Sequence, residues 1–174
     1  MGTAVIIVGL VAATIVAAVV ITNWNSYIVV DRGKVSIPRF VKEGEVRTSD
    51  LPALVKALSS GSQEVRYAAL IFSAPDRPSE QDVLNLQLSF ENGKVGFDWV
   101  LLAPRNIEDQ AKFSEFAREH GVEPVSRTLN GVSYLRVEDT DVAEFASLIV
   151  TEMYRRPPDE PLDLVFQGFD WPQN

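Results

Sequence analysis

The hydrophobic positions of this chain form one uninterrupted block followed by shorter periodic stretches. Residues 3–22 carry no charged side chain, and all but four of them are Ala, Val, Ile or Leu. A helix of about 20 residues rises about 30 Å, which is the thickness of the hydrocarbon core of a bilayer. Because lipid offers no partner for free backbone groups, this block predicts a single transmembrane helix.

The block is too long for the apolar core of a cleaved signal peptide and lacks the basic start that such peptides usually have, so we expect a retained anchor. Trp24 and Tyr27 follow the block, as is typical of the membrane interface. Basic residues occur only after it, from Arg32 onwards. The positive-inside rule therefore places the following domain in the cytoplasm.

Small residues recur every four positions within the block, at Gly9, Ala13 and Ala17. Such a ribbon allows two helices to approach closely, and it would let two anchors pack as a homodimer. The plainer explanation is that Gly and Ala are common in transmembrane helices, and this explanation stays open.

Three later stretches have the i, i+3, i+4 periodicity of helices with one buried face. They cover residues 50–60, 107–120 and 141–154. Ser49 and Asn106 precede the first two and are predicted to be their N-caps.

Other stretches show the alternation or the short apolar runs of strands. They cover residues 65–73, 84–90, 95–102, 122–129, 132–138 and 162–169, and a small hairpin is expected around residues 31–34. The dipeptides Asn92-Gly93 and Asn130-Gly131 predict two type I′ hairpin turns.

The element order α-β-β-β-α-β-β-α-β predicts an α+β fold, with a mainly antiparallel sheet and helices on one face. The expected organisation is a transmembrane anchor over residues 1–22, a juxtamembrane connector over 23–48 and a globular domain over 49–174.

Composition narrows the functional classes. Acidic residues outnumber basic ones 24 to 16, which gives a net charge of −8, and no basic run appears. Nucleic-acid binding is therefore not expected. With no cysteine and one histidine, no thiolate site, metal site or cofactor motif is predicted.

The candidate catalytic residues are Asp98, Asp170 and Arg105. Asp98 and Asp170 each stand between a Phe and a Trp. On neighbouring strands, the two carboxylates would raise one pKa or hold a hard cation. Arg105 lies where a strand leads into a helix, a place suited to anions. The plainer explanations are solvent-facing strand positions and ordinary turn chemistry. His120 is expected only to meet a helix C-terminus.

Two functional classes remain. The first is a membrane-anchored binding or scaffold module with a protein partner, which is the interpretation that we favour. The second is a membrane-anchored enzyme with a carboxylate site, for example a hydrolase. Whether the three candidates converge in one pocket distinguishes the two, and the sequence leaves open whether the chain is an enzyme.

Overall fold

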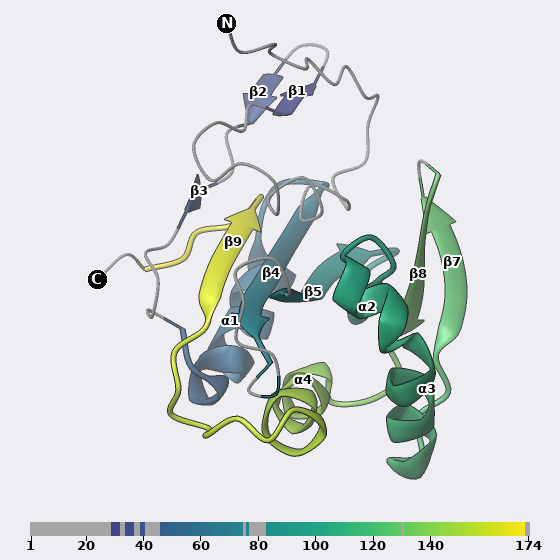
Figure 1. Ribbon diagram of the computed structural model, residues 1–174. Coiled ribbons are helices and arrows are strands. Elements are labelled where there is room, and N and C mark those ends of the chain that lie inside the picture. Colours follow the sequence, from purple (N-terminus) through teal and green to yellow (C-terminus); the bar gives the residue numbers. More distant parts are fainter. Residues whose placement is uncertain are drawn as a thin grey trace, which may run out of the picture.

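The alternating stretches assemble into an antiparallel sheet. The computed structural model describes residues 29–31, 34–36, 39–40, 46–74, 76, 83–129 and 131–172. Their strands lie in the order β3-β9-β4-β5-β6-β8-β7, with antiparallel pairing throughout (Figure 1). The strands are β3 (Arg39–Phe40), β4 (Arg66–Ser73), β5 (Val83–Glu91), β6 (Lys94–Val100), β7 (Val125–Leu129), β8 (Val132–Val137) and β9 (Asp163–Gln167). A separate hairpin pairs β1 (Val29–Asp31) with β2 (Lys34–Ser36), as expected.

The predicted helices form, with changes at their ends. The helices are a 3₁₀ turn η2 (Thr48–Asp50), α1 (Leu51–Ser60), α2 (Pro104–Glu108), α3 (Gln110–Glu119), α4 (Val142–Leu148) and a π-helical turn η3 (Ile149–Met153). The predicted helix 107–120 is thus two helices that meet at Asp109, and the predicted helix 141–154 ends in a π turn. Asp141 caps α4 by accepting hydrogen bonds from the backbone N–H groups of Ala143 and Glu144.

Two predicted N-caps are wrong. Ser49 lies within η2, and it is the carboxylate of Asp50 that accepts a hydrogen bond from the backbone N–H of Arg47. Asn106 lies inside α2, where its side chain binds the backbone of Asn85 in β5 instead of its own helix. At the first helix the capping bond is made locally by Asp50 instead of Ser49, whereas Asn106 bonds to a distant strand.

The helices α1, α3 and α4 pack on one face of the sheet (Figure 1). Their buried side chains join the alternate residues of β4, β5 and β6 in one cluster that includes Leu54, Leu86 and Phe145. At its centre the indole of Trp99 stacks on Phe113, with ring centroids 4.6 Å apart and planes 8° apart. An α+β fold with an antiparallel sheet is therefore confirmed.

The second face of the sheet is also buried. It carries a small apolar cluster on β4 and β9 and a polar group farther along the sheet. The apolar residues are Tyr67, Ala69, Ile71 and Val165, and the polar ones are Asn85, Gln87, Ser89, Asp98 and Arg136. The alternation along β5 correctly assigns Asn85, Gln87 and Ser89 to this face. The solvent exposure expected for Asp98 is wrong, because the exposed fraction of this residue is 0%.

The folded unit begins before residue 49. Val46 is fully buried and forms a β-bridge with Leu162, and the hydroxyl of Thr48 donates to the carbonyl of Pro158. The expected boundary between connector and domain therefore falls inside the packed unit. The expected anchor over residues 3–22 lies outside the described residues, and within the described ranges no helix has the length and apolarity needed to cross a bilayer.

The first predicted hairpin turn has the geometry of a type I′ turn. Asn92 and Gly93 have φ angles of 52° and 84°, and the flanking residues Glu91 and Lys94 pair directly. At the second turn Gly131 has φ 82°, while Asn130 lies outside the described residues.

Gly93→Val should lower the free energy of unfolding by about 1–2 kcal/mol, because a β-branched residue resists positive φ. No atom lies within 4 Å of a Cβ built at Gly93, so the effect would be conformational and not steric. Gly93→Asn is the matched control and should cost less, since Asn tolerates the left-handed region. Urea unfolding of the three proteins measures this, and equal stabilities would contradict it.

Candidate functional site

The three candidate catalytic residues do not meet. Asp98 lies on β6, and β4 and β5 separate β6 from β9. The strand that carries Asp98 and the strand that precedes Asp170 are therefore not neighbours. Arg105 follows the C-terminal end of β6, whereas Asp170 follows the C-terminal end of β9. Because Gln167 at the end of β9 pairs with Tyr67 at the start of β4, Arg105 and Asp170 lie at opposite ends of the sheet.

Asp98 belongs to a buried charge cluster on the second face. Its carboxylate accepts hydrogen bonds from the Ser89 hydroxyl and, at 2.7 Å, from Nη1 of Arg136. Nε of Arg136 donates to Glu138, also at 2.7 Å. Burial raises the pKa of the Asp98 carboxyl to about 6, against the opposing effect of the Arg136 charge.

The backbone makes room for this cluster at Gly96. A Cβ built there would overlap the guanidinium of Arg136, so the missing side chain lets that group lie across β6. Farther out, Arg127 donates to Glu91 and to Glu138, at 3.3 and 2.7 Å. Each of the three acids of this cluster is thus ion-paired with one or both of its two arginines, and these pairs link β5, β6, β7 and β8.

Arg105 is enclosed by carboxylates. Its Nε donates to Asp109 at 2.7 Å and its Nη2 to Asp76 at 3.1 Å. The hydrogen bond from Arg105 lowers the pKa of the Asp76 carboxyl. The anion expected at this helix start is therefore supplied by the chain itself, through Asp76 and Asp109.

The same network positions Tyr154. The Tyr154 hydroxyl donates to Oδ2 of Asp109 at 2.7 Å, and burial raises the pKa of its phenol. The ring lies parallel to Trp99, with centroids 6.5 Å apart. Tyr154 is thus held at one end by a carboxylate and along one side by the aromatic core.

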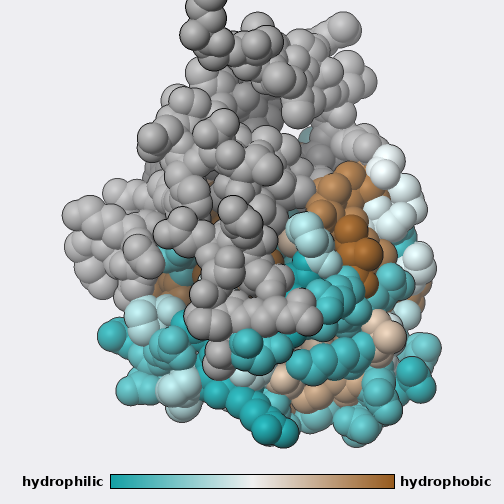
Figure 2. Space-filling model, in the orientation of Figure 1, coloured by the Kyte–Doolittle hydropathy of each residue, from teal (hydrophilic) through white to brown (hydrophobic). Residues whose placement is uncertain are grey.

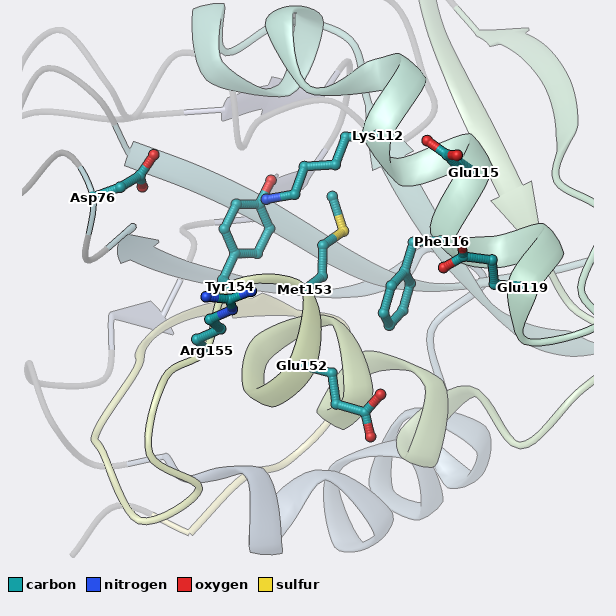
Figure 3. Close-up of a pocket in the computed structure, with 9 residues that line it drawn as sticks. All are labelled: Asp76, Lys112, Glu115, Phe116, Glu119, Glu152, Met153, Tyr154 and Arg155. Atoms are coloured by element: carbon teal, nitrogen blue, oxygen red, sulfur yellow. The ribbon is translucent and has the colours of Figure 1, made fainter.

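Tyr154 borders an open groove of about 610 Å³ between α3 and η3 (Figure 3). The lining residues are Asp76, Lys112, Glu115, Phe116, Glu119, Glu152, Met153, Tyr154 and Arg155. Four of them are acidic and two are basic. In Figure 3, Lys112 extends over the ring of Tyr154, and its Nζ lies 4.4 Å from the ring centroid.

The apolar floor of the groove lies between the carboxylates. Phe116 and Met153 lie between α3 and η3, with Glu115 and Glu119 on one side and Glu152 on the other (Figure 3). Glu115 and Glu119 are four residues apart on α3, a spacing at which like charges destabilise a helix by about 0.2–0.5 kcal/mol. Hydrophilic side chains predominate on the lower part of the molecule, where α1, α3 and α4 lie (Figure 2).

The wall formed by η3 is irregular. The backbone N–H of Tyr154 donates to the carbonyl of Ile149, five residues earlier, and Arg155 then has a φ of 55°. A non-glycine residue at positive φ stores strain of order 1–3 kcal/mol, and π turns and strained residues are frequent at functional sites. Both features occur where the chain forms the wall of the groove.

His120 ends α3 beside the groove, as its predicted place at a helix C-terminus requires. Its Nδ1 lies 2.9 Å from the Phe116 carbonyl and its Nε2 3.4 Å from Glu152.

Among the described residues no three His, Asp or Glu side chains are arranged to hold a metal ion. The acidic pair on α3 is the signal that could have revealed the groove in the sequence.

Comparisons with known proteins give no relative. No protein-family model matches the chain, and no curated protein or solved structure matches it significantly.

Arg136→Met should lower the free energy of unfolding by about 3–5 kcal/mol, because it leaves the buried Asp98 carboxylate without its counter-ion. Adding Asp98→Leu should recover much of that loss, since a buried pair can be replaced by apolar residues at little cost. Denaturation at about pH 7.5, followed by Trp fluorescence, measures both. A double variant less stable than Arg136→Met would contradict this role of the pair.

Proposed function

We propose that this protein is a single-pass membrane-anchored binding module, and that its groove beside α3 receives a basic segment of a partner protein. The observation that carries the proposal is the groove itself, in which Glu115, Glu119 and Glu152 lie beside an apolar and aromatic floor. A lysine or arginine side chain fits this arrangement, because its stem packs on apolar atoms while its charged end reaches the carboxylates.

Apart from Asp76, which is paired with Arg105, the groove is lined by three glutamates and by the two bases Lys112 and Arg155. Lys112 is directed at Tyr154, while Glu115 and Glu119 repel each other across one turn of α3. A cation from a partner would relieve that repulsion. Exposed ion pairs contribute about 0.2–1 kcal/mol each, so the affinity of the groove alone is modest.

A membrane anchor compensates for modest affinity. Tethering raises the effective concentration of a weak binder for partners in the same membrane. The apolar block at residues 3–22 has the length and composition for that anchor, and the basic residues after it favour a cytoplasmic domain. An acidic domain is also repelled by anionic headgroups, which leaves its groove accessible to a protein.

The separation of Asp98, Arg105 and Asp170 supports the module over the enzyme. A carboxylate enzyme needs its acid and base beside one substrate, whereas Asp98 and Asp170 belong to strands that are not neighbours and Arg105 lies at the opposite end of the sheet from Asp170.

The double variant Glu115→Gln, Glu119→Gln should weaken binding of a labelled peptide of alternating lysine and leucine about five- to tenfold, which corresponds to about 1–1.4 kcal/mol. The control is Glu64→Gln, Glu123→Gln, which removes the same charge from exposed positions outside the groove. Fluorescence anisotropy measures both. An equal loss in the control would show that net charge, and not the groove, attracts the peptide.

The anchor and its orientation can be tested with a single cysteine, because the chain has none of its own. Glu123→Cys places a thiol at an exposed position of the domain. A membrane-impermeant maleimide should label it only after the cells are permeabilised. Adding Val11→Lys and Ile15→Lys should release the chain from membranes, at a cost of about 2.5–3.5 kcal/mol per charge. Labelling of intact cells would reverse the proposed orientation.

A further inference from the structure

The strand β7 ends the sheet with one side unpaired. Among the described residues it pairs with β8 alone, and it lies at the outer edge of the sheet (Figure 1). Leu129 and Val132 face each other across a two-residue turn, so their backbone groups bond to each other. Backbone direction alternates along a strand, and the N–H and C=O groups of Ser126 and Thr128 therefore point outward.

This edge carries only part of the protection that usually prevents strands from associating, namely Pro124 just before the strand and the inward-directed charge of Arg127. Exposed edges are normally protected by lysine, proline, a bulge or an inward charge. Residues 125–129 contain no lysine or proline, and they pair with β8 in continuous register. The charge of Arg127 is directed to Glu91 and Glu138. Val125, by contrast, has an exposed fraction of 54%. Among the described residues, Ile107 is the other large apolar residue that is exposed.

We propose that β7 pairs antiparallel with β7 of a second copy of this chain, with the two-fold axis at Arg127. In this register Ser126 lies opposite Thr128 of the partner subunit, and their outward backbone groups form about four hydrogen bonds. Val125 lies opposite Leu129 of the partner subunit on the same face of the sheet. The strand is thus complementary to itself, with small hydroxyl residues facing each other on one side and apolar residues on the other.

Arg127 does not oppose this pairing. It meets its own copy at the axis, but its guanidinium lies 3.3 Å from Glu91 and 2.7 Å from Glu138, so its charge is compensated within each chain. Because the strand has five residues, the contact is smaller than the 1,200–2,000 Å² typical of stable complexes. The dimer is therefore weak and forms at high local concentration. It does not require the groove.

The register can be tested by oxidative cross-linking of the full chain at high concentration in mild detergent. The separately tagged variants Ser126→Cys and Thr128→Cys keep Arg127, and their mixture should form a mixed disulfide while each alone forms little. Directly opposed residues in this register lie within the Cα separation that a disulfide spans. Arg127→Cys should cross-link to itself, because only residue 127 lies on the axis. Homodimers of Ser126→Cys or Thr128→Cys as abundant as the mixed species would overturn the register.

Proline distinguishes specific pairing from random collision. Thr128→Pro removes an outward N–H without breaking a bond to β8, so the chain should still fold. Added to Arg127→Cys, it should reduce the disulfide dimer at least fivefold, whereas Thr128→Val should not. Circular dichroism verifies that each variant folds. Undiminished cross-linking in the proline variant, or no cross-linking of any cysteine variant, would refute the proposal. The variant Glu115→Gln, Glu119→Gln should cross-link normally, which separates this test from that of the groove.

Discussion

The buried amide of Asn106 connects the sheet to the helices that cover it. Pairing between β5 and β6 stops at Leu86 and Trp99, and the next residue, Asn85, bonds instead to both ends of the Asn106 side chain. The carbonyl of Asn106 in turn accepts the Trp99 indole N–H at 2.9 Å. Leaving such buried groups unbonded costs about 1–3 kcal/mol each, so this residue strongly constrains where α2 begins.

The position of α2 determines that of the groove. With α2 held against β5, α3 presents Phe113 to Trp99, and Asp109 at the junction of the two helices reaches both Arg105 and Tyr154. The Tyr154 ring therefore closes one end of the groove at a place determined by the sheet. Glu115 and Glu119 of α3 and Glu152 of η3 line the same groove, because Phe113 of α3 and Tyr154, which follows η3, both stack on Trp99.

The sequence patterns correctly predicted those features of the fold that depend on residues close together in the chain. Alternation along β5 identified its two faces, and Asn92-Gly93 identified its turn, because both depend on residues that are close in sequence. The pairing of Asp98 with Arg136 and of Val46 with Leu162 could not be predicted, since each joins residues far apart in the chain. The interpretation of Asn106 as a cap was wrong for the same reason. A cap and a bond to a distant strand use the same side-chain amide, and only the tertiary structure decides between them.

The groove and the β7 edge lie on different elements, so the two proposed contacts do not compete. Two chains joined through β7 present two grooves, and a partner with two basic segments, or an array of partners in one membrane, would engage both. The second binding event is then intramolecular, and its gain depends on whether the spacing of the segments matches that of the grooves. The two proposed contacts, an exposed acidic groove and a short strand edge, would reinforce each other if the proposed membrane anchor confines the chain. This explains why neither surface needs the size or apolarity of a permanent interface.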